Sequence, residues 1–291
     1  MQKHLLVTVS EKKSALYGVR FVGHFFSNKD SIKVTLFYTA PKPPSVWEGE
    51  KTLEGERQRE QQTKEQETKG RRALEEAKKT LGMMGFHQDQ LETKLIVRKT
   101  SKVDEIIREG SEGLYDAVVL GRRGLSRFEE AFDESVSRKL LEEKCNFPVW
   151  VCRRPDLERK NVLICVDGSD AAYCIVDHAG FILKEEPDHK VTLLLVRRKG
   201  KISTSEADEI VSKSKEILLR HEFPEKKTRI EVVDDGNVPK TIMEHAEEGK
   251  YAVVATGRTG MDRGLFKKMF MGSVSQTLFR ELEKSTLWTC Q

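Results

Sequence analysis

The sequence predicts an α/β protein built from two tandem doubly wound domains, residues 1–157 and 158–291. Three observations predict this class: the chain repeats internally, strand-like runs alternate with helical stretches, and the runs are apolar without alternation. Unalternated apolar strands indicate a parallel sheet covered by helices on both faces. At 291 residues and 37% hydrophobic content, each half is long enough to bury its own core.

The repeat appears as matched strand-like segments. Residues 5–10 lie 157 positions before residues 162–167, and residues 34–37 lie 157 before residues 191–194. At the glycine pairs further along, the separation falls to 136. The first copy is therefore longer by 21 residues between its second strand and its glycine loop.

In the first half, five strands are expected, at residues 5–9, 34–38, 95–97, 117–120 and around Val149. Helices are expected at residues 14–26, at 103–109 and through Val136, Leu140 and Leu141. Residues 48–81 carry Glu/Lys and Glu/Arg pairs at i,i+4 spacing, which predicts a long, mostly solvated helix. A docking face is the alternative interpretation of these charges, but such a run is more often an exposed helix.

After a short linker at residues 153–156, the second half repeats the plan. Its expected strands are residues 162–166, 191–196, 230–233, 251–255 and 286–290, and its expected helices are 171–183, 206–219, 239–246 and 274–282.

Each copy carries a glycine-rich connection after its fourth strand. The glycines are Gly121 and Gly124 in the first copy and Gly257, Gly260 and Gly272 in the second. Glycine lets the backbone approach an anion closely, and the free N–H groups of a following helix carry partial positive charge. The pattern favours a phosphate site, although glycines that serve only the turns are the alternative interpretation.

These motifs carry a resemblance. A strand that ends in Val166-Asp167-Gly168-Ser169, followed by G-x-x-G, a spacer, G-S-V-S and a closing apolar strand, resembles the universal stress protein family. The resemblance covers nearly the whole chain, as two domains in tandem. It implies the strand order 3-2-1-4-5 in each, and pairing of the two closing strands into an internal pseudo-dimer with Trp150 and Trp288 near the seam. A homodimer is left open.

The family holds an adenine nucleotide outside the carboxyl ends of the strands, where the strand order reverses. The resemblance therefore implies ATP or AMP as the ligand, with or without Mg²⁺. The residues expected to bind it are Asp167, Gly168, Val196, Gly257, Arg258, Gly260, Gly272, Ser273 and Val274. Asp167 would face the adenosine, the backbone of Val196 the base, and the glycine loop the phosphates.

The first copy is expected to hold a degenerate site, made of Ser10, Thr39, Gly121, Gly124, Glu134 and Ser135. Ser10 stands where the second copy has Asp167, and Glu134 stands where it has Gly272. A carboxylate at a helix N-terminus repels phosphate. The second copy also departs from the family, because its spacer of eleven residues, 261–271, exceeds the usual nine. We expect at most one nucleotide per chain, in the second half.

Other functional classes find little support. The net charge of +4 comes without a clustered basic face, which argues against a nucleic-acid partner. We find no G-x-x-x-x-G-K-[ST] loop, G-x-S-x-G elbow or H-E-x-x-H pair, so catalysis is not indicated. The five cysteines lack zinc-site spacing and are expected to be buried and reduced, with no metal.

No apolar run approaches the ~18 residues of a membrane span, and the apolar N-terminal segment is too short for a signal peptide. A cytoplasmic protein is expected. The leading function is a nucleotide-responsive protein with a stress-response or regulatory role. The alternatives are a scaffold that binds another protein without nucleotide, and a slow ATP hydrolase.

Overall fold

The computed structural model describes residues 2–11, 16–42, 53–122, 130–143, 145–198, 200–258 and 272–291. The first half contains β1 (Lys3–Thr8), α1 (Leu16–Phe25), β2 (Ile32–Ala40), α2 (Leu53–Met83), β3 (Leu91–Val97), α3 (Lys102–Glu112), β4 (Ala117–Gly121), α4 (Glu130–Glu142) and β5 (Val149–Cys152). The second half contains β6 (Val162–Cys165), α5 (Asp170–Leu183), β7 (Val191–Arg197), α6 (Thr204–Arg220), β8 (Thr228–Asp234), α7 (Val238–Glu248), β9 (Val253–Gly257), α8 (Ser273–Glu281) and β10 (Thr286–Cys290).

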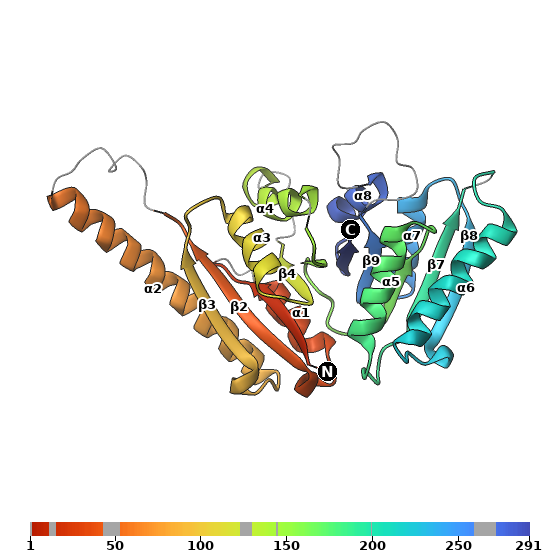
Figure 1. Cartoon of the computed structure of the whole chain (residues 1–291), viewed down its shortest axis with the longest axis horizontal. Helices are drawn as coiled ribbons and strands as arrows, with labels where there is room; N and C mark the ends of the chain where they lie inside the picture. The colour runs from red at the N-terminus through yellow and green to blue at the C-terminus, as the bar shows by residue number, and fades with distance from the viewer. Residues whose placement is uncertain are drawn as a thin grey trace.

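The ten strands form a single sheet in the order β3-β2-β1-β4-β5-β10-β9-β6-β7-β8 (Figure 1). Within each half all paired strands are parallel, in the order 3-2-1-4-5 counted along the chain. The fold class and the strand order implied by the resemblance are both confirmed.

The two halves meet where β5 and β10 pair antiparallel, with Trp150 opposite Trp288. The two indole rings stack with their centroids 4.1 Å apart and their planes 10° from parallel. Every residue of both strands is buried. Each closing strand thus covers the apolar edge of the other, as expected for an internal pseudo-dimer.

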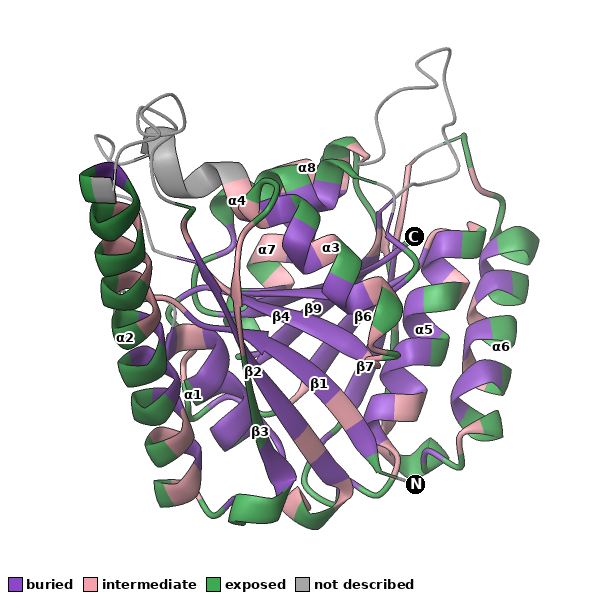
Figure 2. Ribbon diagram, turned by 60° about the vertical axis from the view of Figure 1, so that its left-hand side comes forward, coloured by how far each residue is buried: buried purple, intermediate pink, exposed green. Residues whose placement is uncertain are grey.

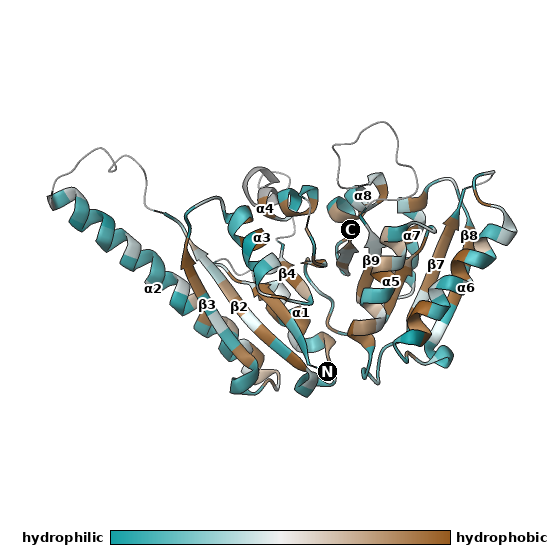
Figure 3. Cartoon of the chain, viewed as in Figure 1, coloured by the Kyte–Doolittle hydropathy of each residue, from teal (hydrophilic) through white to brown (hydrophobic). Residues whose placement is uncertain are grey.

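Each face of the sheet carries one apolar cluster that runs through both halves. Helices α1, α2, α5 and α6 cover one face, and α3, α4, α7 and α8 cover the other. The central strands are therefore buried on both sides, as Figure 2 shows. Their apolar residues contrast with the hydrophilic helix α2 in Figure 3.

Helix α2, the long charged segment, starts at Leu53 in the described residues and ends at Met83, where the sequence predicted residues 48–81. Only its outer face is solvated. Its later turns bury Leu74, Ala77 and Leu81, and a Cβ added at Gly70 would lie 2.6 Å from the Tyr38 ring of β2. The charged helix is thus mostly solvated, as expected, while its inner face covers β2 and β3.

Four of the five cysteines are buried as expected: Cys145, Cys152, Cys165 and Cys290. Cys174 corrects that expectation, because it lies exposed on α5. All five are free thiols. In the part of the chain that the structure describes, no helix is both long enough and apolar enough to cross a membrane.

Candidate functional site

The carboxyl ends of β6, β7 and β9 lie side by side in the second half, because β6 pairs with both of the others. Chain order reverses at β6, since β7 lies on one side and β9 on the other. Such a switch point is where open parallel α/β sheets bind ligands. Asp167 follows β6, Val196 lies near the end of β7 and Gly257 ends β9.

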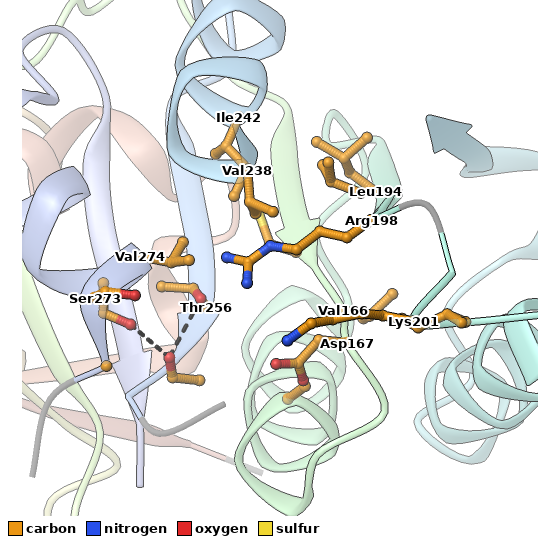
Figure 4. Close-up of a pocket in the computed structure, with 17 residues that line it drawn as sticks. Val166, Asp167, Leu194, Arg198, Lys201, Val238, Ile242, Thr256, Ser273 and Val274 are labelled. Atoms are coloured by element: carbon orange, nitrogen blue, oxygen red, sulfur yellow. Dashed lines mark hydrogen bonds between the residues drawn. The ribbon is translucent and has the colours of Figure 1, made fainter. Parts of the chain in front are cut away.

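A cavity of about 200 Å³ opens at this point (Figure 4). It is lined by Cys165, Val166, Asp167, Ala172, Leu194, Val196, Arg198, Lys201, Ile202, Val238, Ile242, Thr256, Gly257, Gly272, Ser273, Val274 and Ser275. Most of these side chains are apolar or carry only a hydroxyl. The expected residues Asp167, Val196, Gly257, Gly272, Ser273 and Val274 all belong to this lining.

Two glycines are required by the backbone around the cavity, one in its lining and one in the turn before α5. A Cβ on Gly257 would lie 2.7 Å from the backbone carbon of Ala171 and 2.8 Å from the nitrogen of Ala172, so only glycine lets α5 start this close to β9. Gly168 has a φ of +83°, which favours glycine. Gly168 thus contributes the turn from β6 into α5 and is not part of the cavity lining.

The Asp167 carboxylate is held by the first residue before α5. Its Oδ1 accepts a hydrogen bond from the Ser169 N–H at 3.0 Å and from the Ser169 hydroxyl at 2.6 Å. Ser169 also caps α5, since its Oγ accepts from the Ala172 N–H at 3.2 Å. The carboxylate is therefore fixed at the mouth of the cavity, where Figure 4 shows it facing Lys201.

Helix α8 begins at the cavity, with Gly272 as its N-cap. The Gly272 N–H donates to the Arg258 carbonyl at 2.5 Å, and the Ser275 hydroxyl donates to the Gly257 carbonyl at 2.7 Å. The Gly272 N–H therefore already has an acceptor. The first-turn N–H groups of Ser273 and Val274 have no acceptor within the helix, so these two amides are the ones an anion could meet.

Arg258 corrects the sequence prediction. Its side chain is fully buried and lies outside the cavity. Nη1 donates to the carbonyls of Leu140, Leu141 and Glu143 at 3.5, 3.4 and 3.2 Å, at the C-terminal end of α4 in the other half. Carbonyls at a helix end lie at the negative end of its dipole, so they draw the guanidinium away from the cavity.

Arg122 makes the reciprocal contact from the first half. Its Nη1 donates to the Phe279 carbonyl at the end of α8, and its guanidinium carbon lies 3.8 Å from the centre of the Phe279 ring. Arg122 and Arg258 each follow a fourth strand, at Gly121 and Gly257. Each arginine therefore binds the last helix of the opposite half, a role that the sequence did not predict.

The first half places Ser10, Thr39 and Gly121 at the ends of β1, β2 and β4, which matches the geometry of the second site. Glu11 stands at the position of Gly168 and accepts a hydrogen bond from the Tyr38 hydroxyl at 2.8 Å. Gly124 and Gly260 lie outside the described residues. Glu134 and Ser135 belong to α4, but their side chains are not described. The expected phosphate-side contacts of the first half stay predictions.

The cavity contains residues that the sequence did not predict. Arg198 and Lys201 follow β7, Thr256 belongs to β9, and Val238 and Ile242 belong to α7. The signal for the two cations was a basic cluster placed immediately after a predicted strand. Burial and the charge of Asp167 raise the pKa of the Cys165 thiol, which keeps it neutral. Among the described residues, no group of three His, Cys, Asp or Glu side chains could hold a metal ion.

The chain is similar to known proteins both in sequence and in fold. The model of the universal stress protein family matches residues 1–153 and again residues 158–288. A universal stress protein from Archaeoglobus fulgidus DSM 4304 is 18% identical with a TM-score of 0.70, over 99% of this chain and 98% of that one. A protein of unknown function from Pseudomonas aeruginosa PAO1 is 13% identical with a TM-score of 0.59, over 99% and 92%.

A universal stress protein family protein from Arabidopsis thaliana, solved with AMP bound, is 17% identical with a TM-score of 0.36, over 54% of this chain and 94% of that one. The search of curated proteins returned no match. The two family matches together span nearly the whole sequence. The chain therefore belongs to the universal stress protein family, as a tandem of two family units.

Proposed function

We propose that the second half, residues 158–291 as a domain of its own, binds one adenine nucleotide and that the protein acts as a nucleotide-responsive regulator in the cytoplasm. The observation that carries the proposal is the cavity at the switch point, where Asp167, Val196 and the start of α8 meet. A carboxylate suits a ribose hydroxyl, a strand-end backbone suits the edge of a base, and free helix amides suit a phosphate.

The apolar part of the cavity supports an adenine ring. Val166, which follows β6, lines the cavity together with Leu194 and Val196 of β7 and Ile242 of α7, and all four side chains are apolar. Apolar walls with a few placed polar groups are typical of small-molecule sites. A scaffold that used its surface for another protein would need none of these features at the strand ends.

The test starts with the full chain as purified. Mass spectrometry of molecules released on heat denaturation should find an adenine nucleotide. Calorimetric titration of stripped protein with ATP and with AMP, the ligand of the Arabidopsis structure, should give a stoichiometry near one. Absence of binding to either, under conditions where the protein is folded, would leave the scaffold interpretation. Phosphate release from ATP over hours would indicate the hydrolase.

A substitution locates the site. Asp167→Ala should weaken nucleotide binding by about 1–3 kcal/mol, because a buried polar contact loses its partner. Asp208→Ala, which removes the same charge from the exposed face of α6, is the matched control and should change nothing. Binding that survives Asp167→Ala unchanged, or a stoichiometry of two, would move the ligand away from this cavity.

A further inference from the structure

Two cations reach the cavity from the connection between β7 and α6. Arg198 is half-buried and Lys201 is exposed, and both line the cavity. In Figure 4 the Arg198 guanidinium extends across the cavity towards Thr256 and Val274, and the Lys201 ammonium ends beside Asp167. Neither residue belongs to the glycine loop. Together with Asp167 they are the charged members of the described lining.

Hydrogen bonds hold the chain at both ends of the connection that carries these cations. On the strand side, Arg197 bonds Asp234 of β8 through Nε to Oδ1 at 2.5 Å and Nη2 to Oδ2 at 2.8 Å. On the helix side, Ser203 caps α6 and exchanges hydrogen bonds with Glu206 at 3.2 and 2.7 Å. These hydrogen bonds fix the residues on either side of the connection, which places Arg198 and Lys201 beside the cavity.

The turn itself also has a defined conformation. The Lys201 N–H donates to the Arg198 carbonyl at 3.1 Å, and Gly200 has a φ of +76°. Glycine adopts this left-handed conformation without the steric cost that a Cβ would add. The turn brings Arg198 and Lys201 to the same side of the chain, towards the ends of β6 and β9 (Figure 4).

The charge of the cavity favours an anion. Two cations face one carboxylate across the described lining, and the amides of Ser273 and Val274 add the positive end of the α8 dipole. An uncharged ligand such as a nucleoside would offer Arg198 no charge-assisted hydrogen bond. A phosphate placed between Arg198 and α8 would be met by a charge-assisted hydrogen bond on one side and by helix amides on the other.

The first half has neither cation at the matching position. At the same 157-residue separation that matches the strands, Arg198 and Lys201 correspond to Pro41 and Pro44. Proline carries no charge and no side-chain donor, so neither cation is repeated at its own position, and the basic residue beside Pro41 is Lys42.

We propose that Arg198 and Lys201 select a phosphorylated adenine ligand over adenosine, with Arg198 contacting a phosphate oxygen and Lys201 adding charge beside Asp167. This inference rests on the proposed nucleotide function. It says that the phosphate group decides which adenine compounds bind at that site. It also places the cation that contacts this phosphate in the β7–α6 connection, whereas the sequence predicted Arg258.

The experiment compares AMP with adenosine by calorimetric titration of the full chain. The wild type should bind AMP more tightly than adenosine by about tenfold or more, and raising the salt concentration should reduce this preference. Arg198→Met should weaken AMP binding about tenfold while adenosine changes less than about twofold, since only the phosphate contact is lost. Lys201→Met should shift the ratio in the same direction by less, because its ammonium is exposed.

Two controls keep the outcome clear. Arg198→Lys retains the charge and should retain part of the preference. Arg220→Met removes an exposed cation from the far end of α6 and should leave both affinities unchanged. If the wild type prefers AMP and Arg198→Met keeps the full preference, the inference is wrong while the proposed function stands. If the wild type binds adenosine as tightly as AMP, the inference is also wrong. If the wild type binds neither AMP nor adenosine, both the inference and the proposed function are wrong.

Discussion

The two halves of the molecule agree at the seam and differ at the strand ends. At the seam, Trp150 faces Trp288, and Arg122 and Arg258 each bind the last helix of the opposite half. At the strand ends, the second half has Asp167, Gly168, Gly272 and Arg198 where the first has Ser10, Glu11, Glu134 and Pro41. The contacts that join the halves are therefore separable from the residues that would bind a ligand, and each set can be tested alone.

The largest effect is expected when the halves are separated. In the full chain every residue of β10 is buried, and Leu287, Trp288 and Thr289 pair with β5. Expressed alone, residues 158–291 would expose this apolar edge, so we expect a dimer or aggregates. Light scattering on the fragment and on the full chain at equal concentration measures this. A fragment that stays a well-behaved monomer would show that the seam adds little to either half.

The next effect concerns the reciprocal arginines. Arg258→Met should lower the free energy of unfolding by about 3 kcal/mol, because charged hydrogen bonds to buried helix-end carbonyls are lost. Arg122→Met should cost a similar amount if the seam is symmetric. Urea unfolding of both variants measures this, with Lys240→Met as a control whose cation is 64% exposed. A cost below about 0.5 kcal/mol for either arginine would contradict its role in the seam.

The seam also shows what the sequence could predict. The repeat and the unalternated apolar runs predicted ten strands, and the family resemblance implied their order and the pairing around Val149 and Leu287. Each of these depends on a local pattern that is repeated in the chain. The burial of α2 against Tyr38 was missed, because a charged helix gives little sign of which narrow stripe is covered.

The site was predicted less completely, for physical reasons. Asp167, Gly257 and Gly272 line the cavity, and their places there could be predicted because they follow from strand ends and a helix start. Arg258 was misassigned because its partners, the carbonyls at the end of α4, come from the other half of the chain. Arg198 was missed because the turn at Gly200, with its φ of +76°, decides which side the cations face. Long-range partners and turn geometry do not appear in a local pattern.

A moderate effect is expected when the second half receives the glutamate of the first. Gly272 has a φ of −70°, which any residue can adopt, so Gly272→Glu should fold. Its carboxylate would stand at the start of α8 and repel phosphate. The ligand-induced stabilisation, about 2.7 kcal/mol at a hundredfold excess over the dissociation constant, should disappear in thermal unfolding. Gly236→Glu, in open space, is the control. Unchanged stabilisation would place the ligand elsewhere.

The smallest effect is expected at the core beside the seam, where the second half has His178 and the first has Phe21 at the matching position. His178 Nε2 accepts a hydrogen bond from Trp150 Nε1 at 3.0 Å. Burial lowers the pKa of His178 from 6.5 to about 3, although the charge of Asp177 acts in the opposite direction. At neutral pH, His178→Phe should cost about 1 kcal/mol, because the Trp150 N–H loses its acceptor.

The effect of His178→Phe on the free energy of unfolding should also depend on pH. As the pH falls below 6.5, the unfolded chain takes up a proton that the folded His178 accepts only near pH 3, so the wild type loses stability that it holds at neutral pH. The loss is about 1.4 kcal/mol per pH unit within that window, and the phenylalanine variant lacks it. Urea unfolding at neutral and mildly acidic pH should therefore show the deficit of His178→Phe closing as the pH falls. Replacing the exposed His24 by Gln is the control for the loss of a surface histidine. A deficit of His178→Phe that does not change with pH would mean that the folded and unfolded chains take up the His178 proton at the same pH, and that burial beside Trp150 does not lower this pKa.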